Sequence, residues 1–489
     1  MSTKRKLLVA LAVFLLVIGG IVYYIWRGTP AEHTTEALSG KEPLISKPKP
    51  ESIPSVSIAK PVGWAKGEAP IAAQGLEVKR FAEGLDHPRV IHALPNGDVV
   101  VAEAQSPTST IGGGFTGWVA KQLMSRAGSG GESPDRLVLL RDGDGDGVAE
   151  RRFTLIEGKH LASPSGMGWA DDELYVANHD AVIVFDYKLG ETAITGEPRK
   201  VMDLPAAGNH WMRNLVLSPD GNRLYVAVGS ASNIGENGME LEKGRAAIWE
   251  KDLTKDTYPR QYAQGLRNPN GLAFHPATGE LWTTVNERDQ LGPDLVPDYL
   301  TNVPLGAHYG WPWLYWKTYD DVRVNVAPPE FIDDYVRKPE YALGAHTAPL
   351  GLAFIKGGER MGPIFANGAF VARHGSWNRK PAAGYDVVFI AFDANGNPLG
   401  KPLPVLTGFL TGEGTTRGRP TWVGFAKDGA LLVTDDTAGI VWRVTAPGAA
   451  PAAVIKPVVV GRMLPRRRLD SDPARMKGAF KPDGEAKQQ

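Results

Sequence analysis

One short pattern of strand, turn and strand recurs six times along the chain and constrains its fold more than any other feature. Several of the turns carry Asp-Gly or Asn-Gly pairs, which favour tight hairpins between short apolar strands. A single hairpin of this kind cannot bury both of its faces, so successive copies must pack around a common axis. The copies start at Pro88, Pro164, His210, Arg267, Pro349 and Pro420.

We therefore predict an all-β fold, a six-bladed β-propeller, over residues 71–448. The 57 glycines suit such a turn-rich protein. A pair of β-sandwiches with similar hairpins is the alternative, and the repetition of one pattern favours the propeller. In a propeller the turns before the inner strands point to one end of the axis, so His210, Arg267 and Arg419 are expected to lie near one another.

Charge and cysteine content exclude several functional classes. Lysine plus arginine equals aspartate plus glutamate, 54 each, so nothing in the charge balance indicates a nucleic-acid partner. The chain has no cysteine. Disulfides, thiolate metal sites, cysteine nucleophiles and covalently attached c-type haem are therefore excluded.

The N-terminus predicts a membrane anchor over residues 1–27. Three basic residues, Lys4-Arg5-Lys6, precede an uncharged apolar run of 20 residues from Leu7 to Trp26, which is long enough to span a bilayer. The positive charge places the N-terminus in the cytoplasm. We expect a single-pass protein of a bacterial inner membrane with its main domain in the periplasm; a cleaved signal peptide is the alternative.

Two further segments lack the pattern of folded elements. Residues 28–70 are rich in Pro, Ser, Lys and Glu, which predicts a flexible linker between anchor and propeller. Residues 449–489 are Pro- and Ala-rich, then basic, then polar, and are expected to form an extended, mostly disordered tail.

An acidic loop after the first copy is a candidate metal site. Asp142, Asp144 and Asp146 alternate with glycines, and Glu150 follows, which matches a short calcium loop. A full EF-hand would need a glutamate where Phe153 stands. A plain Asp-Gly hairpin turn is the alternative to a structural calcium site.

Polar residues at the start of three copies are candidates for a functional site. His210 is a candidate general base, with a hydrogen-bonded structural histidine as the alternative. Arg267 offers a planar fork for a carboxylate, and Asn268 both donates and accepts; a purely structural turn is the other interpretation. Arg419 occupies the matching place in the sixth copy, and several arginines at one axis would bind a polyanion.

The stretch 286–294 is rich in side-chain oxygen atoms and has no regular pattern. Such a backbone suits a hard cation bound partly by carbonyl groups, although an ordinary loop has the same composition.

These segments, taken in order, resemble a known family. His210 stands before a strand, Arg267-Asn268-Pro269 precedes Gly271-Leu272, Asn286-Glu287-Arg288-Asp289 follows, and Tyr309-Gly310-Trp311-Pro312 comes last. The ordered set resembles sugar dehydrogenases that depend on pyrroloquinoline quinone (PQQ), of the soluble glucose dehydrogenase type, and most closely their sorbosone dehydrogenase branch. The resemblance covers roughly residues 76–445 and implies a six-bladed propeller.

The resemblance also implies a role for each matching residue. His210 would be the general base, and Arg419 would bind a carboxylate of the cofactor. Arg267 and Asn268 would contact the carboxylates and carbonyls of the quinone, with Arg288 over the cofactor. The backbone carbonyls of Asp289 and Gln290 would hold a catalytic Ca²⁺.

Two positions depart from the family's pattern. Thr421 stands where a second arginine is expected, and a cofactor-binding lysine of the fifth blade has no clear match. Arg379 and Lys380 are the candidates to replace that lysine.

The implied activity is oxidation of the C1 hydroxyl of an aldose, or of an aldehyde hydrate such as that of sorbosone, by hydride transfer to PQQ. A separate electron acceptor, a cytochrome c or a quinone, would complete the reaction. Two other functions stay open: a metal-dependent hydrolase such as a propeller lactonase, and a non-catalytic ligand-binding propeller.

Overall fold

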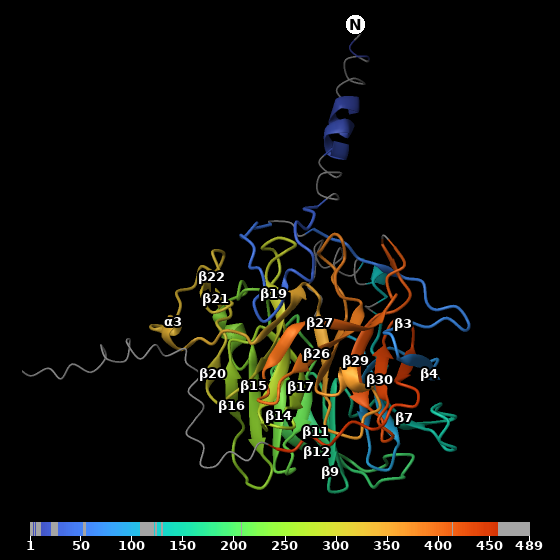
Figure 1. Cartoon of the computed structure of the whole chain (residues 1–489). Coiled ribbons are helices and arrows are strands. Elements are labelled where there is room, and N and C mark those ends of the chain that lie inside the picture. The colour runs from blue at the N-terminus through green and yellow to red at the C-terminus, as the bar shows by residue number, and fades with distance from the viewer. Residues whose placement is uncertain are drawn as a thin grey trace, which may run out of the picture.

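Six antiparallel sheets form a closed ring (Figure 1). The structure is a computed structural model that describes residues 28–51, 55–107, 131–206, 208–412 and 414–457, together with residues 3, 5, 11–20, 122 and 125–128. The inner strands of the six sheets contact one another in chain order, and the last contacts the first. The predicted six-bladed β-propeller is therefore confirmed, and each repeat of the sequence forms the two inner strands of one blade.

Each of the first three blades is built from four strands that are consecutive in sequence. Their strands, from the axis outward, are β5 (Pro88–Ala93), β6 (Val99–Glu103), β7 (Arg136–Arg141) and β8 (Arg151–Glu157); β9 (Gly166–Ala170), β10 (Glu173–Ala177), β11 (Ala181–Asp186) and β12 (Arg199–Asp203); and β13 (Leu215–Leu217), β14 (Arg223–Val228), β15 (Ala247–Asp252) and β16 (Arg260–Gln264). A short 3₁₀ helix, Met239–Glu242, lies between β14 and β15.

The remaining blades differ in what is added to them. Their strands are β17 (Asn268–Phe274), β18 (Leu281–Asn286), β19 (Pro297–Asn302) and β23 (Tyr341–Ala345); β24 (Pro349–Phe354), β25 (Gly368–Arg373), β26 (Asp386–Phe392) and β27 (Pro398–Thr407); and β29 (Pro420–Phe425), β30 (Leu431–Asp435) and β31 (Ile440–Thr445), completed by β4 (Glu77–Glu83). The strand β4 comes from the N-terminal side of the propeller and pairs antiparallel with β31, which closes the ring. A second 3₁₀ helix, Pro363–Phe365, precedes β25.

An excursion of the chain separates β19 from β23 in the fourth blade. It contains β20 (Ala307–His308), β21 (Leu314–Tyr315), β22 (Tyr319–Asp320) and the single-turn helix α3 (Ile332–Tyr335). The strand β20 pairs in parallel with β16, so the excursion lies against the outer edge of the third blade.

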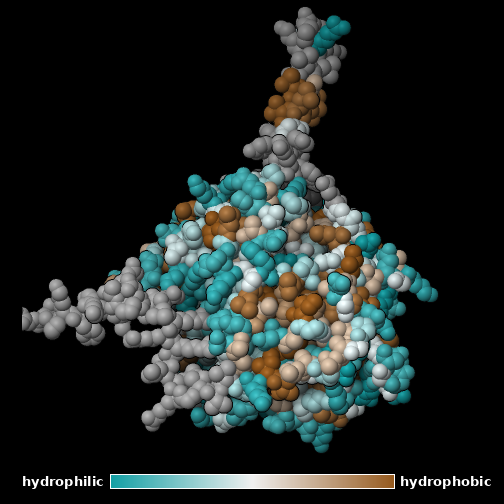
Figure 2. All heavy atoms as spheres, in the orientation of Figure 1, coloured by the Kyte–Doolittle hydropathy of each residue, from teal (hydrophilic) through white to brown (hydrophobic). Residues whose placement is uncertain are grey.

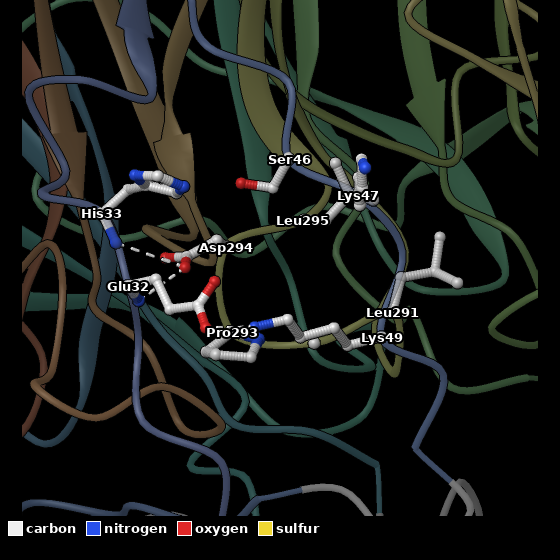
Figure 3. Close-up of a pocket in the computed structure, with 10 residues that line it drawn as sticks. Glu32, His33, Ser46, Lys47, Lys49, Leu291, Pro293, Asp294 and Leu295 are labelled. Carbon is white, nitrogen blue, oxygen red and sulfur yellow. Dashed lines mark hydrogen bonds and ion pairs between the residues drawn. The ribbon is translucent and has the colours of Figure 1, made fainter.

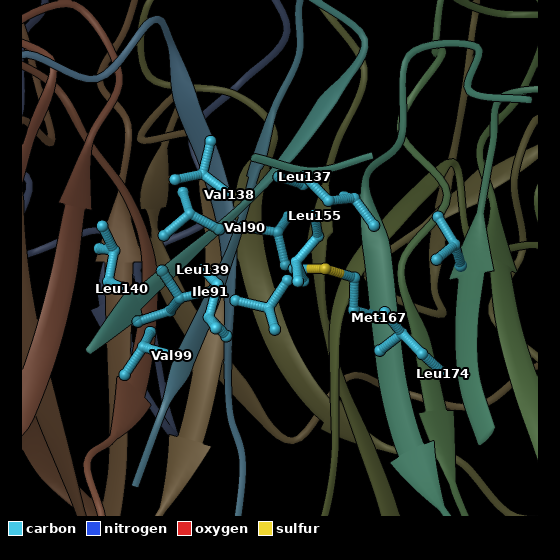
Figure 4. Close-up of a cluster of buried hydrophobic side chains, with 14 of the residues drawn as sticks. Val90, Ile91, Val99, Leu137, Val138, Leu139, Leu140, Leu155, Met167 and Leu174 are labelled. Carbon is cyan, nitrogen blue, oxygen red and sulfur yellow. The ribbon is translucent and has the colours of Figure 1, made fainter. Parts of the chain in front are cut away.

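Buried aliphatic side chains fill the space between neighbouring blades. Figure 4 shows this between the first two blades, where Val90 and Ile91 of β5 lie among Leu139, Leu155 and Met167. Each fully buried side chain of this size contributes roughly 1.5–3 kcal/mol relative to an exposed one. The repeats therefore hold the ring together mainly by packing, which fixes the positions of the loops at its ends.

Glycines in the repeats let the inner strands of adjacent blades come close. A Cβ at Gly271 would lie 2.4 Å from the carbonyl oxygen of Leu350 in the next blade, and one at Gly351 would lie 2.6 Å from the amide nitrogen of Val423. No side chain fits such gaps. This explains why both copies carry a glycine at the start of their shared Gly-Leu-Ala-Phe sequence.

The N-terminal segment differs from the flexible linker expected at 28–70. The strand β1 (Ser39–Gly40) pairs with β23, and β2 (Lys60–Pro61) pairs with β28 (Thr415–Thr416); β3 (Ile71–Ala72), just beyond, pairs with β27. Backbone hydrogen bonds to the fourth, fifth and sixth blades hold this stretch against the propeller, although its composition lacks the periodicity of a strand.

The two ends of the chain reach into undescribed residues. Residues 11–20 are helical, and apolar side chains such as Phe14 and Leu16 are exposed (Figure 2). The rest of the expected anchor is largely outside the described residues, and among those that are described no helix has the length and apolar character to span a membrane. Of the expected tail, residues 449–457 contact the propeller through a hydrogen bond from Gly358 N to Ala452 O (2.9 Å), and the remainder lies outside the described residues.

Candidate active site

His210 lies in the loop before β13, at the end of the axis where the inner strands begin. Its Nδ1 lies 2.8 Å from the carbonyl oxygen of Ser230, and the amide of Ser230 in turn donates to the carbonyl oxygen of Arg267 (2.7 Å). Because a carbonyl only accepts hydrogen bonds, Nδ1 carries the hydrogen and Nε2 keeps a free lone pair. Burial, followed by the nearby Arg267 cation, lowers the pKa of His210 to about 3. The ring is therefore neutral at physiological pH, in the tautomer that a general base requires.

Asn268 of the fourth blade lies beside His210. A Cβ added to Gly229, on the loop between them, would be 2.3 Å from Asn268 Oδ1 and 2.6 Å from His210 Cβ. Glycine at this position therefore lets the two residues approach each other. Asn268 Oδ1 is buried and has no hydrogen-bond partner within the described part of the chain.

Arg267 is directed into the loop that follows β18. Its guanidinium donates to Glu287 O (2.6 Å), to Asn233 O (3.1 Å) and to Asn233 Oδ1 (3.0 Å), and it forms an ion pair with Asp289 Oδ2 at 3.1 Å. Burial alone would raise the pKa of Asp289, but Arg267 and His346 hold it far below its ordinary value. All three guanidinium nitrogens of Arg267 therefore donate to groups of the protein. In this arrangement no N–H group of Arg267 is left for the predicted contact with a quinone carboxylate.

Arg419 belongs to a group of charged side chains that the sequence did not indicate. Its Nε and Nη2 donate to the carbonyl oxygens of His374 and Gly375, both at 3.1 Å. His374 Nε2 lies 2.9 Å from Asp436 Oδ2, and Arg89 from the first blade pairs with the same carboxylate. His374 and Arg89 keep the pKa of Asp436 well below its usual range against the effect of burial. This group joins the first, fifth and sixth blades at the axis.

The residues of this second group have a recognisable position in the repeats. Asp436 follows the second strand of its copy and His374 follows the second strand of another, whereas His210, Arg267 and Arg419 stand before the first strands of theirs. Because adjacent strands are antiparallel, the end of each second strand lies at the same end of the axis as the start of the first. Arg89 stands next to Pro88 at the start of the first copy, the same place that His210 and Arg267 occupy in theirs.

The carbonyl groups expected to hold a catalytic calcium ion are already hydrogen-bonded. Asp289 O accepts from Arg288 Nη1 (2.6 Å) and from Asn233 Nδ2 (3.1 Å). Gln290 O accepts from the amide of Glu51 (3.1 Å) and from Arg323 Nη1 (3.2 Å). Each carbonyl has two lone pairs, and in both groups one partner is a cation that would repel Ca²⁺. The two carbonyls therefore do not fit calcium in this arrangement.

Arg288 and Arg379 bind other parts of the protein in this arrangement, although both are predicted to contact the cofactor. Arg288 is buried against Asp321 of the excursion, with Nε 2.7 Å from Oδ2. Arg379 donates to His33 O (2.6 Å) and to Asp294 Oδ1 (3.2 Å) beside a cavity under the N-terminal segment, whose lining Figure 3 shows. These partners hold Arg379 in the N-terminal contact in this arrangement, and its replacement of the missing lysine stays a prediction.

Lys380 and Thr421, the two other residues at which the family's pattern is in question, have structural contacts. The carbonyl oxygen of Lys380 accepts a hydrogen bond from the amide of Ala31 (2.7 Å). The hydroxyl of Thr421 donates to the carbonyl oxygen of Arg419 (3.3 Å) and is fully buried. Thr421 thus supports the turn that carries Arg419.

The acidic loop between β7 and β8 brings its four predicted ligands together. One carboxylate oxygen from each of Asp142, Asp144, Asp146 and Glu150 lies within 4.8 Å of the others. Several of these oxygens also accept hydrogen bonds from amides of the loop, such as Gly145 N to Asp142 Oδ1 at 2.7 Å. The loop lies at the outer side of the first blade, apart from the axial residues.

The axial residues fit an anionic cofactor such as PQQ, which carries carboxylates. Among the described residues, the one hydrogen-bond acceptor for Arg89 Nε and Nη2 is the sulfur of Met212, at 3.4 and 3.2 Å, and sulfur is a weak acceptor. Arg419 Nη1 has no hydrogen bond to the described residues, and Asn268 Oδ1 is an unpaired acceptor. Two guanidinium groups face one carboxylate, Asp436, so an added anion would balance the charge.

Comparison with known proteins supports the fold and the family. The family described as TrAA12-like matches residues 136–299 and 330–447, together more than half of the chain. A pyrroloquinoline quinone-dependent sugar dehydrogenase of Hypocrea jecorina is 24% identical over 423 residues, covering 76% of this chain and 88% of its own. A pyrroloquinoline quinone-dependent pyranose dehydrogenase of Coprinopsis cinerea is 31% identical over 303 residues, which are 50% of this chain and 41% of that one.

A solved structure agrees with the architecture. The iodide structure of the Trichoderma reesei carbohydrate-active enzyme of family AA12 superposes with a TM-score of 0.62 at 20% identity, over 77% of this chain and 98% of that one. At this identity the likeness shows the fold alone. The profile match, which spans more than half of the sequence, goes further, and on that ground the chain belongs to the TrAA12-like family.

Proposed function

We propose that this protein is a PQQ-dependent sugar dehydrogenase whose general base is His210. The observation that carries the proposal is the neutral His210 ring, with an available Nε2, beside Asn268 and at the same end of the axis as the under-used donors of Arg89 and Arg419. The relatives named as PQQ-dependent sugar and pyranose dehydrogenases support the same reaction class.

The chain's own residues would hold the reactants and remove one proton. Arg89 and Arg419 would bind carboxylates of the cofactor, and Asn268 would orient it. His210 Nε2 would accept the proton of the substrate's C1 hydroxyl. When bound, PQQ supplies the two-electron acceptor for the hydrogen that leaves C1 as hydride. Loss of one proton and one hydride converts an aldose to a lactone, or an aldehyde hydrate to an acid.

The substrate class is proposed as aldoses or aldehyde hydrates, including sorbosone-like compounds. A separate acceptor, a cytochrome c or a quinone, would then reoxidise the cofactor. We further propose that residues 1–27 anchor the protein to a bacterial inner membrane with the propeller in the periplasm. The exposed apolar side chains on the helix of residues 11–20 support this attachment.

The proposal considers two calcium sites, one at the axis and one in the acidic loop between β7 and β8. At the axis, Ca²⁺ would bind Asp289 O and Gln290 O only after Arg288 and Arg323 leave them, so the proton transfer above does not depend on it. At the loop of Asp142, Asp144, Asp146 and Glu150, clustered oxygens favour a structural calcium ion.

Reconstitution tests the proposed function. The purified protein is incubated with PQQ, with and without Ca²⁺, and reduction of an artificial electron-accepting dye is followed with a panel of aldoses. Sugar-dependent dye reduction is expected only with PQQ. No binding of PQQ would overturn the proposal and favour a ligand-binding propeller, and hydrolysis of lactones by the cofactor-free protein would favour a metal-dependent hydrolase.

A further inference from the structure

A cavity of about 280 Å³ lies at the rim of the propeller, away from the axial residues. It is formed between β16, the outermost strand of the third blade, and the excursion that carries β20 and α3. Figure 1 shows these elements together on one flank of the ring. The cavity is lined by polar and aromatic side chains, among them Gln261, Tyr262, Gln264, His308, Trp313 and Tyr335.

The aromatic side chains of this rim cavity are anchored but accessible. Tyr335, at the end of α3, is 51% exposed although its ring is large and apolar. Trp313 is half-buried and is fixed by a hydrogen bond from Nε1 to Val326 O (3.0 Å). Tyr262 packs edge-on against Tyr225, with 5.1 Å between ring centroids. Rigid aromatic rings at an open cavity offer flat surfaces to the C–H faces of a ligand ring.

His308 adds a hydrogen-bond donor of fixed direction. Its Nδ1 accepts from the amide of Gly310 (3.0 Å), so the hydrogen of the neutral ring is on Nε2. Burial lowers the pKa of His308 to about 4, which keeps the ring neutral at physiological pH. Gly265, with φ of 71°, allows this position, because a Cβ there would lie 2.5 Å from His308 Cε1.

The amides complete a set of uncharged donors and acceptors. Gln264 Nε2 donates to Gln261 Oε1 (3.0 Å), which holds the two side chains in a fixed relation and leaves Gln264 Oε1 and Gln261 Nε2 for a ligand. None of the described residues that line the cavity is Lys, Arg, Asp or Glu. A ligand matched to these walls is uncharged, rich in hydroxyl groups and flat on at least one apolar face.

We propose that the rim cavity binds a pyranose unit of a glycan. Sugars combine hydroxyl groups, which pair with amides and imidazole, with C–H faces, which stack on aromatic rings. The cavity is slightly smaller than those that take drug-sized ligands, which suits one sugar ring. This site is distinct from the axial one, and its existence does not depend on the dehydrogenase activity proposed above.

Methyl glycosides test the site without interference from oxidation, because they lack a free C1 hydroxyl. The full-length protein, free of PQQ, is titrated with the methyl pyranosides of glucose, mannose, galactose and xylose, and binding is measured by saturation-transfer NMR. At least one glycoside is expected to bind. Tyr335→Ala and Gln264→Ala are each expected to weaken that binding about tenfold or more, a loss of about 1.4 kcal/mol.

Two control variants separate this site from other surfaces. Tyr319→Ala removes another exposed aromatic ring of the same excursion, outside the cavity, and is expected to leave binding unchanged. His210→Gln is also expected to leave it unchanged, because His210 belongs to the axial site. The proposal is overturned if no glycoside of the panel binds, if both cavity variants bind as the wild type does, or if a control variant loses binding to the same extent. Gln264 is an exposed side chain, so Gln264→Ala keeps the test valid if Tyr335→Ala does not fold.

Discussion

The Nδ1 atom of His210 lies 2.8 Å from the carbonyl oxygen of Ser230, and this contact decides which nitrogen of the imidazole is basic. The same serine is hydrogen-bonded through its amide to the carbonyl oxygen of Arg267, so the orientation of the ring is tied to the fourth blade. A histidine held in this way presents Nε2 as an acceptor without any movement of the backbone.

Replacing His210 by glutamine is expected to lower the turnover of sugar by roughly 10²–10⁴-fold, the usual contribution of a general base. PQQ binding, measured separately by equilibrium dialysis, is expected to change little. His179→Gln is the matched control, because His179 also bonds a backbone carbonyl, that of Ala162, at the same end of the second blade. Wild-type turnover in His210→Gln would remove His210 from its proposed role.

The pH dependence of kcat/KM is expected to reflect the lowered pKa of His210. A base must be unprotonated to act, and this pKa is lowered to about 3, so activity should stay level as the pH falls to about pH 4 and decline below that. An ordinary histidine would instead give half of the activity near pH 6.5. Brief assays started by a pH jump avoid unfolding, and each pH is measured in two different buffers. An inflection of kcat/KM between about pH 6 and pH 7 in both buffers would contradict the assignment of His210 as the base.

Arg89→Met and Arg419→Met are each expected to weaken PQQ binding by roughly 10–100-fold, because a hydrogen bond to a charged group contributes about 1.5–3 kcal/mol. Quenching of tryptophan fluorescence by PQQ measures this without sugar. Arg417→Met is the control, since Arg417 lies near Arg419 in sequence but stacks on Trp64, 5.6 Å from the ring centroid. Equal affinity in all four proteins would show that the cofactor does not use this group of arginines.

Glu287 should make the stability of the protein depend on pH. Burial raises the pKa of Glu287 from 4.5 to about 7, so the folded protein keeps a proton that the unfolded chain has lost. Its contribution to stability is complete below about pH 4.5 and is lost as the pH rises to about pH 7. Relative to Glu287→Gln, the wild type should therefore lose on the order of 3 kcal/mol across this window. A constant difference in the free energy of unfolding from pH 4 to about pH 8 would contradict this.

Chelation of calcium is expected to lower the melting temperature by a few degrees if the loop of Asp142, Asp144, Asp146 and Glu150 binds the ion. The double variant Asp142→Asn, Asp144→Asn should melt at the lower temperature with or without chelator. Asp220→Asn alters an exposed Asp-Gly turn of the third blade and should respond to chelator as the wild type does. Calorimetry measures all three, and no response in the wild type would exclude a structural calcium ion here.

The fold could be predicted from sequence because each blade repeats one local pattern. The inner strands of the copies are mostly apolar and are joined by turn residues, as where β14 (Arg223–Val228) follows Gly221. The strands of the N-terminal segment were not predicted for a physical reason: they have two residues each, and their partners, β23 for β1 and β28 for β2, are distant in sequence. A strand this short leaves no periodicity in the sequence.

The site was predictable only in part, because its residues are distant in sequence and come together only when the propeller ring is closed. His210 and Asn268 stand at the starts of copies and are placed together as expected. Asp436 and His374 contact Arg89 only when the sixth blade lies against the first. No local sequence motif indicates this contact. The position of Arg379 depends on Asp294 and on the path of the N-terminal segment past His33, neither of which the local sequence around Arg379 indicates.

The pairing of β4 with β31 sets the order in which the protein can mature. The strand β4 is synthesised by residue 83, yet its partner begins at Ile440, so it must wait unpaired while almost the whole propeller is made. Contacts so distant in sequence form slowly, because a long loop must close before they add stability. A nascent chain, whether on a ribosome or emerging from a translocation channel, would therefore present an open ring with two free strand edges until its last blade arrives.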